Sequence, residues 1–489
     1  MVHWNFEPTM DITGKQPATP GFRELGNLLA ERAEAGVDVR IVLNGAQVLG
    51  AFGAPGYSPC WDARKDLIAR LPPGSTSPPL KDSVLYDWSG AEMTGSQHQK
   101  ATVIARGALL VAFVGGIDPH PLMLDDTPHN SIVLPNVSPP VSWGWHDGGI
   151  RLVGGAAAGV YANFADRWEE ARTLPQARLL VHRPGHRVPQ VVEYAPPAVG
   201  AVPPPPATPA PNPTHAASVQ VLRSRYRTKL NRPWLRRPWT TAGGGELTQI
   251  YETLAKAISG AQRYIYLEDQ FLGDHPVLPD LLHRPVWGLL DSVIGRGRLE
   301  SFSLFPHLAN ALRRGVKVIA VGSGFADPGD LITGPKNRTL NPQLTELANI
   351  HPAALAVWRI EQVTVHTKLC IIDDVFAAIG SANLQSRSMM GVDAELHTAV
   401  VSDASLVSDL RARLWSEHLA IDYAATSGAL KTNLDDLSTA LGMWRSVWSP
   451  TAGMWFSPNN PPGFSPATLQ PGVPRTTVVR AFVGPGSVA

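Results

Sequence analysis

At 489 residues, with 44% hydrophobic and 17% charged residues, the chain is long enough for two globular domains and lacks the composition of a disordered protein. Its formal net charge is only +1, so it has no basic footprint of a nucleic-acid-binding protein, and we expect no nucleic-acid partner. No apolar run reaches membrane-spanning length, which predicts a chain without a transmembrane segment.

The first half begins with a short strand, a helix and a second strand. The first strand is expected at residues 2–6, directly at the start of the sequence. Leucines at helical spacing over residues 22–32 predict the helix, which leads through a glycine into an apolar strand at residues 37–43. The start has no basic region followed by an apolar core, so no secretory signal is visible.

The first candidate site residues are His98 and Lys100. They are two residues apart on a predicted strand, so their side chains project from the same face. An apolar strand at residues 109–114 follows and runs into a Gly-Gly-Ile-Asp turn that ends at Asp118. A Trp-His-Asp sequence that ends at Asp147 comes next. The first half therefore carries a histidine, a lysine and two acidic residues that follow predicted strands.

A proline-rich segment separates the two halves. It covers residues 191–217 and is expected to be an extended, semi-rigid linker that lacks the apolar content to fold. We therefore predict an N-terminal lobe over residues 1–190, a C-terminal lobe over residues 218–430 and an irregular tail over residues 431–489.

The second half repeats the order of the first and adds one helix. A helix at residues 304–314 leads through a glycine into a strand at residues 316–321, as in the first half. A further helix at residues 250–258 has no counterpart there. Either that helix is dispensable or the chain has lost its true beginning, and a lost beginning would leave secretion open. Helices that alternate with strands predict right-handed crossovers and largely parallel sheets with helices on both faces.

The second half also carries its own copy of the site residues. His366 and Lys368 have the spacing of the first copy and precede apolar residues that end in Gly-Ser-Ala-Asn, with Ser381 and Asn383. Glu395 follows in Asp-Ala-Glu-Leu. Two copies of one pattern in a single chain predict one site with two halves.

With Asp373 completing His-x-Lys-x4-Asp in the second copy, the duplicated pattern resembles the phospholipase D superfamily. The likeness extends to Tyr-Ile-Tyr-Leu-Glu-Asp-Gln-Phe at residues 264–271, to the Trp-His-Asp sequence and to Leu-Trp-Ser-Glu-His-Leu at residues 414–419. The resemblance implies two α/β/α sandwich lobes with mixed, largely parallel sheets, related by pseudo-two-fold symmetry, with the active site between them.

The resemblance also implies roles for the site residues. His98 is expected to be the nucleophile that forms a phosphohistidine, and His366 the general acid for the leaving alcohol. Asp147 and Glu395 resemble the carboxylates that orient the histidines, and their order in the sequence pairs each with the histidine of its own half. The residues expected to hold the phosphoryl oxygens are Lys100, Lys368 and Asn383. The residues expected to bind substrate are Asp118, Ser381 and Gln270.

Two positions depart from the family pattern. Ala105 stands where the first copy should have its aspartate, and Gln97 stands where eukaryotic-type members often have a second histidine. In the family this aspartate supports the fold near the site, so we expect its loss to affect local stability more than chemistry. A catalytically impaired lipid-binding homologue is the alternative that these departures leave open.

The expected function is that of a phospholipase D, which hydrolyses the headgroup phosphodiester of glycerophospholipids to phosphatidic acid. Its companion reaction is transphosphatidylation, in which the phosphatidyl group passes to an alcohol instead of water. The alternatives are a cardiolipin-synthase-type phosphatidyltransferase and a phosphodiesterase or nuclease of the same superfamily. The expected partner is a phospholipid at a membrane surface, and a monomer should suffice. No cofactor or metal is expected, since Cys60 and Cys370 fit buried thiols and have no metal-ligand spacing. The compartment stays open between cytoplasmic, peripheral-membrane and secreted.

Overall fold

The structure is a computed structural model of the chain. It describes residues 1–13, 20–45, 59–70, 80–88, 96–120, 123, 145–174, 177–181, 190–207, 217–225, 247–272, 302–323, 342–351, 354–360, 364–402, 405–418, 435–440 and 479–482.

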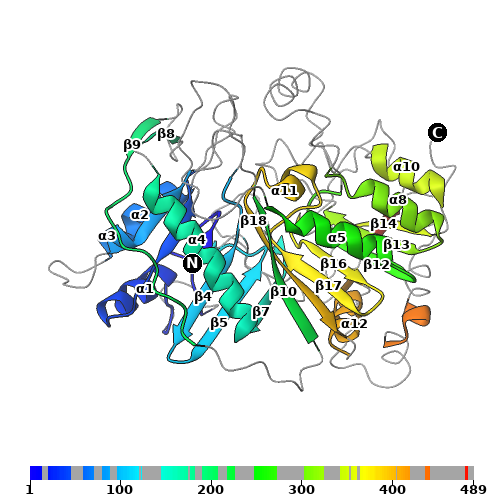
Figure 1. Ribbon diagram of the computed structural model, residues 1–489, viewed down its shortest axis with the longest axis horizontal. Helices are drawn as coiled ribbons and strands as arrows, with labels where there is room; N and C mark the ends of the chain where they lie inside the picture. Colours follow the sequence, from blue (N-terminus) through cyan, green and yellow to red (C-terminus); the bar gives the residue numbers. More distant parts are fainter. Residues whose placement is uncertain are drawn as a thin grey trace.

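A mixed six-stranded sheet forms the centre of the N-terminal lobe (Figure 1). One of its faces packs against the long helix α4 (Gly155–Thr173), whose Phe164 and Trp168 contact the sheet. The other face packs against α1 (Leu25–Glu34) and α2 (Pro59–Ala69), and the short α3 (Leu80–Ser83) leads into the edge strand. The strands, in spatial order, are β3 (Val84–Asp87), β2 (Ile41–Asn44), β1 (Val2–His3), β4 (Ala101–Arg106), β5 (Leu109–Gly115) and β7 (Gly149–Val153).

The C-terminal lobe is built on a nine-stranded sheet. One apolar cluster on one face includes α5 (Gln249–Gly260), α8 (Phe305–Arg313) and α10 (Pro342–Ile350). On the other face α12 (Leu406–His418) packs its buried Trp415 against the tyrosines of β12. The strands, in spatial order, are β11 (Leu247–Thr248), β10 (Ala217–Arg225), β18 (Glu395–Ser402), β17 (Phe376–Gly380), β16 (Leu369–Ile372), β12 (Tyr264–Asp269), β13 (Lys317–Ser323), β14 (Leu355–Ile360) and β19 (Val479–Phe482).

Both sheets contain the same topological unit. The order β3-β2-β1-β4-β5-β7 in the first lobe matches β14-β13-β12-β16-β17-β18 in the second. In both, the first three strands are parallel and each later pair is antiparallel. The predicted two-lobed α/β fold with an internal duplication is thus confirmed.

The prediction that the sheets are largely parallel is wrong. Within the two large sheets, parallel pairs are confined to β1–β3 and β12–β14, and the strands next to the two motifs run antiparallel to their neighbours. The reason is local. Positive-φ residues, Gly107 in one lobe and Asp373 and Asp374 in the other, make tight hairpins that leave no room for a crossover helix.

The extra helix of the second half produces a difference between the lobes. In the C-terminal lobe, Phe376 and Ala378 of β17 are buried in the cluster that includes α5. The equivalent face of β4, β5 and β7 lies open, with Ile104, Phe113 and Val153 between 43% and 55% exposed. The helix that the first half lacks in sequence is therefore matched by an uncovered sheet face in the structure.

The segments predicted as linker and tail both contain regular structure. The first linker residues belong to β9 (Gln190–Tyr194), which pairs with β8 (Ala177–Val181). The proline-rich part that follows lies along the N-terminal lobe, since the Trp168 indole donates to the Gly200 carbonyl at 2.9 Å and the Tyr161 hydroxyl donates to the Pro203 carbonyl at 2.8 Å. In the tail, β19 pairs with β14 at the sheet edge.

The lobes share an apolar core and an ion pair. Leu396 of β18 is fully buried among N-terminal residues that include Leu110 of β5. At the same boundary Arg223 of β10 pairs with Asp166 of α4 at 2.6 Å. These contacts set the position of one motif relative to the other.

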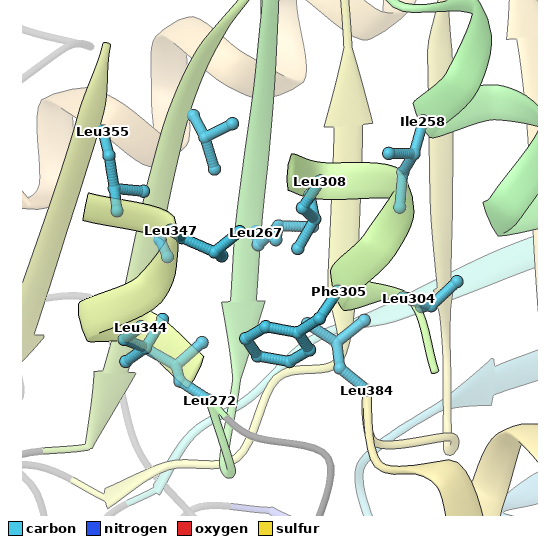
Figure 2. Close-up of a pocket in the computed structure, with 12 residues that line it drawn as sticks. Ile258, Leu267, Leu272, Leu304, Phe305, Leu308, Leu344, Leu347, Leu355 and Leu384 are labelled. Carbon is cyan, nitrogen blue, oxygen red and sulfur yellow. The ribbon is translucent and has the colours of Figure 1, made fainter. Parts of the chain in front are cut away.

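A small apolar cavity lies within the C-terminal core (Figure 2). Figure 2 shows Leu267 of β12, Leu308 of α8 and Leu347 of α10 around it. Its volume is about 20 Å³, room for little more than one water molecule. The cavity is too small for an acyl chain, although Leu384 in its wall directly follows Asn383.

Candidate active site

The two motif segments lie just before equivalent strands. His98 and Lys100 precede β4, and His366 and Lys368 precede β16. Each motif segment pairs in parallel with a segment of the other lobe: Gln97 with Ala394, and β15 (Thr364–Val365) with β6 (Trp145–His146). This exchange is reciprocal, as a two-fold relation between the lobes requires.

The exchange determines which carboxylate meets which histidine. Glu395 contacts Nδ1 of His98 with both carboxylate oxygens at 3.0 Å, and Asp147 contacts Nδ1 of His366 at 2.7 Å. The pairing expected from the sequence order, within each half, is wrong. Each histidine is oriented by a carboxylate from the opposite lobe, because a parallel backbone pair aligns the residue after Ala394 with His98 and the residue after His146 with His366.

Each carboxylate is itself held by neighbours. Ser381 and Ser388 donate to the two oxygens of Glu395 at 2.6 and 2.7 Å. Asp147 accepts from the Gly148 amide at 2.7 Å, and a Cβ at Gly116 would collide with its carboxylate. The hydroxyl of Ser381, predicted to bind substrate, is thus engaged with the carboxylate behind His98. With Nδ1 of each histidine bound to a carboxylate, Nε2 is the nitrogen left for chemistry.

The two lysines are buried and differ in their partners. Lys100 donates to the His98 carbonyl at 3.0 Å and lies 3.4 Å from the Asp118 carboxylate. Lys368 donates to the His366 carbonyl and lies 3.4 Å from Oε1 of Gln270. The first lysine is therefore paired with a charge, and the second is paired with neutral groups at these contacts.

Electrostatics shows that the two half-sites face each other. Burial lowers the pKa of Lys368 to about 8, with Asp147 opposing the shift and Lys100 adding to it. Burial and the charge of Lys368 lower the pKa of His366 to about 3, and Lys100 also contributes. A lysine of one lobe thus acts on the histidine and lysine of the other. The site thus places two buried lysines near a neutral His366, an arrangement that suits an anionic ligand.

Asp118 and Asn383 occupy equivalent turns but have different surroundings. Asp118 accepts from the Trp4 amide at 3.1 Å and lies 3.3 Å from Nδ1 of His3. Burial alone would raise its pKa, but Lys100 and His3 outweigh burial and lower it. Asn383 is buried, and its Oδ1 has no hydrogen-bond partner among the described residues. An amide oxygen accepts hydrogen bonds, so this buried Oδ1 is available to a donor group of a ligand.

The sequence analysis missed two aromatic neighbours of the histidines. The Trp4 ring lies 5.6 Å from that of His98, edge to face, and also 5.3 Å from the Lys100 ammonium. The Trp145 ring lies 4.4 Å from that of His366. The signal for Trp4 is its position: in the duplicated unit it corresponds to Gln270, which contacts the other lysine.

Asp373 acts as a structural anchor. Its carboxylate accepts from the backbone amides of Gln262, Arg263 and Tyr264 at 2.7 to 2.9 Å, which ties the β16–β17 hairpin to the start of β12. In the described part of the chain, it forms no hydrogen bond with the motif histidine or lysine. This geometry agrees with the structural role expected for the motif aspartate.

Ala105 occupies the position in the first motif copy that Asp373 occupies in the second, and this difference leads to a prediction. Ala105 is exposed and pairs with Leu110 of β5 on one side only. On the other side β1 pairs with β4 only through Val2 and Ala101, so no described strand there offers amides to residue 105. Ala105→Asp should therefore change the free energy of unfolding by no more than about 0.5 kcal/mol and leave turnover unchanged. Denaturant melts and initial rates on both proteins test this expectation. A large rise in turnover would show that the aspartate acts in catalysis.

Two histidine–lysine pairs meet in one site, and each histidine is held by a carboxylate across the lobe boundary. Comparison with known proteins finds similar chains. Residues 294–417 match the family described as "Cardiolipin synthase, PLD-like domain". These matches support a member of the phospholipase D superfamily.

Named relatives and one solved structure are similar over different lengths. Phospholipase D zeta 1 of Arabidopsis thaliana is 35% identical over 107 residues, 19% of this chain and 9% of that protein. Phospholipase D alpha 3 of the same plant is 25% identical over 519 aligned residues, 85% of this chain and 60% of that protein. The chain thus spans less than two thirds of either relative. The crystal structure of phosphatidylserine synthase from Haemophilus influenzae aligns with 86% of this chain and 84% of that chain, at 12% identity and a TM-score of 0.44.

Proposed function

We propose that the protein is a phospholipase D that cleaves the headgroup phosphodiester of glycerophospholipids through a phosphohistidine. The observation that carries the proposal is the pair of oriented histidines, His98 on Glu395 and His366 on Asp147, beside two buried lysines. The named phospholipase D relatives support the choice of substrate class.

The first step forms and breaks one bond to phosphorus. Nε2 of His98 attacks and forms the P–N bond, and the bond from phosphorus to the headgroup oxygen breaks. That oxygen takes a proton from Nε2 of His366 and leaves as an alcohol. In the second step His366 takes a proton from water, whose oxygen attacks phosphorus, and the P–N bond breaks to release phosphatidic acid.

Charge at the phosphoryl group is met by the residues around it. We assign Lys100, Lys368 and the Asn383 amide to the phosphoryl oxygens as charge develops on them. Asp118, which pairs with Lys100, and Gln270, which contacts Lys368, are assigned to positioning these lysines against the substrate. Every step uses side chains of the chain itself and calls for no metal or cofactor.

The acid role of His366 requires a proton that the substrate-free site disfavours. The phosphodiester carries one negative charge, which offsets the lysines that lower the pKa of His366. Substrate binding should therefore raise this pKa and bring the proton to the leaving group. Proton uptake on binding of a non-cleavable phosphodiester, measured by calorimetry in buffers of different ionisation enthalpy, follows from this assignment.

The experiment that tests the proposed function is headgroup release from a panel of phospholipids. Phosphatidylcholine and phosphatidylethanolamine vesicles are incubated with the protein, and the free headgroup and phosphatidic acid are quantified. We expect the two products in equal amounts. Release of neither product from any phospholipid, by a folded protein that cleaves an oligonucleotide, would contradict the lipid assignment and favour the nuclease alternative.

Chelator and alcohol give a further prediction. Because the proposed intermediate is covalent and its formation needs no metal, activity should survive EDTA, and a primary alcohol should compete with water to give phosphatidyl-alcohol. The measurement is product analysis with and without chelator at increasing alcohol concentration. Loss of all activity in chelator would instead indicate metal-assisted hydrolysis.

A phosphatidyltransferase is the second candidate, because the matched family description names cardiolipin synthase. Such an enzyme would use the same intermediate and a lipid alcohol as acceptor. With phosphatidylglycerol as both donor and acceptor, a transferase forms mainly the transfer product, whereas a hydrolase forms mainly phosphatidic acid. The ratio of these two products separates the two functions. A catalytically impaired lipid-binding homologue would bind vesicles and release nothing.

We further propose that a phospholipid surface is the partner and that one chain suffices, since both half-sites lie in it. In the described part of the chain, no helix is both long and apolar enough to cross a membrane. Sedimentation of the active protein tests whether the monomer is sufficient.

A further inference from the structure

A buried cluster of histidines and glutamates lies directly behind the half-site of His366. Glu268 of β12 lies 3.0 Å from Nε2 of His146 and 2.6 Å from Nε2 of His418. It also accepts from the Tyr266 hydroxyl at 2.5 Å. The other ring nitrogen of His146 lies 3.0 Å from the Glu417 carboxylate. The ring nitrogens of His146 therefore both meet carboxylates, from β12 and from α12.

This arrangement favours the charged forms of His146 and Glu268. Burial alone would lower the pKa of His146, but Glu268 and Glu417 outweigh burial and raise it well above its usual value. Burial alone would likewise raise the pKa of Glu268, which His146 and His418 instead lower. His146 is thus an imidazolium held between two carboxylates. Its two ring N–H groups donate to Glu268 and to Glu417.

The backbone of His146 connects this cluster to the site. Its carbonyl accepts from the His366 amide at 2.8 Å and from the Thr367 amide at 3.1 Å, and the Thr367 hydroxyl adds a third bond at 3.1 Å. The next residue is Asp147, which orients the His366 ring. One residue of the N-terminal lobe therefore contacts the general-acid segment through its backbone and two C-terminal elements through its ring.

Among the described residues, the other half-site has no equivalent of this histidine–glutamate cluster. Ala394 corresponds to His146, because each pairs with the residue before a motif histidine. Val2 corresponds to Glu268, because each pairs with the residue after a motif lysine. There, Ser381 and Ser388 hold Glu395 directly. The ionic cluster is therefore specific to the half-site that carries His366.

We infer that His146, with Glu268, Glu417 and His418, is a positioning device that holds Asp147 and His366 in the geometry for proton transfer to the leaving group. This inference rests on the proposed function, in which His366 is the general acid. The four residues touch neither substrate nor the reacting atoms in this account. They act through Asp147, so their loss should affect only the steps in which His366 gives or takes a proton.

A leaving-group experiment tests this inference. A short-chain phosphatidyl-p-nitrophenol needs no acid to expel nitrophenolate, whereas a choline headgroup does. For His146→Gln and Glu268→Gln we expect kcat with the choline lipid to fall by about 10²-fold with KM little changed, as for a displaced catalytic group. The rate of the first nitrophenol burst should stay close to that of the unchanged protein.

Two reference variants make the result decisive. Arg411→Met removes another buried ion pair of α12, Arg411 with Asp374 at 2.6 Å, and should lower the melting temperature without changing the ratio of the two rates. His366→Ala should show the same selective loss as the cluster variants, to a greater extent. If His366→Ala abolishes the burst, the proposed role of His366 is wrong; if only the cluster variants fail to show selectivity, the positioning inference is wrong.

Metal analysis provides an independent test, because two histidines and two glutamates can also bind zinc. The donor atoms of His146, Glu268 and His418 lie within 4.8 Å of one another. We expect the purified protein to contain no stoichiometric metal, since each of these ring contacts already pairs a nitrogen with a carboxylate oxygen. One equivalent of zinc that disappears in Glu268→Gln would overturn the inference.

Discussion

His98→Ala and His366→Ala should each reduce headgroup release by at least ~10⁴-fold in a protein that still folds, because one removes the attacking nitrogen and the other removes the proton donor. The double variant should be scarcely worse than either single one, since the two residues act in one step. Initial rates on a phosphatidylcholine substrate, together with circular dichroism to confirm folding, measure the effect. Near-normal turnover in either single variant would contradict a site shared between the lobes.

The two histidines should differ in one measurement. With the nitrophenol ester, His366→Ala should still release up to one equivalent of nitrophenol and then stall, because formation of the intermediate no longer needs an acid but its hydrolysis needs a base. His98→Ala should release none. A burst in His98→Ala and none in His366→Ala would make His366 the nucleophile and His98 the acid. This outcome is worth testing because the lowered pKa of His366 favours its neutral form, which is the form a nucleophile needs.

Glu395→Gln and Asp147→Asn should have the next largest effects, ~10² to 10⁴-fold, because an amide cannot stabilise the imidazolium and can hold the wrong tautomer. The crossed pairing makes the prediction specific. Glu395→Gln, in the C-terminal lobe, should slow the nitrophenol burst, which depends on His98. Asp147→Asn, in the N-terminal lobe, should spare the burst and slow choline release, which depends on His366.

Matched variants separate this result from a loss of structure. Ser388→Ala removes one of the two hydroxyls that hold Glu395, so it should produce a weaker form of the Glu395→Gln defect. Arg411→Met breaks the ion pair of Arg411 with Asp374 at 2.6 Å, away from Glu395, so it should mainly lower stability. If Asp147→Asn slows the burst and Glu395→Gln does not, the histidine of each lobe is served by its own carboxylate in solution.

Much of this arrangement could be predicted from the sequence because the duplication repeats short local patterns. His98 with Lys100 and His366 with Lys368 have strand spacing, and glycine-rich turns follow them at equivalent positions. Residues two apart on a strand must share a face, so each half-site could be assembled without knowing the fold. The tight hairpins after β4 and β16 could have been predicted as well, since Gly107 and the Asp-Asp pair at residues 373–374 are turn residues. Parallel crossovers were expected instead, on the evidence of the helices alone.

The pairing of carboxylates with histidines could not be predicted, because it depends on how the lobes meet. Asp147 and Glu395 each follow the histidine of their own half in the sequence, and no local pattern indicates that the backbone pairs Gln97–Ala394 and Val365–His146 cross the boundary. The same holds for His146 and Glu268. They lie 122 residues apart in the chain, on β6 of the N-terminal lobe and on β12 of the C-terminal lobe. Their side chains meet only where the two lobes pack together.

Capture of the covalent intermediate tests the central claim most directly. A short-chain phospholipid is mixed with the protein, the reaction is quenched under conditions that preserve phosphohistidine, and peptides are analysed by mass spectrometry. The account predicts a phosphatidyl adduct on His98, strongest in the His366→Ala variant with the nitrophenol ester and absent in His98→Ala. An adduct on His366 alone, or none in a preparation that turns over rapidly, would contradict it.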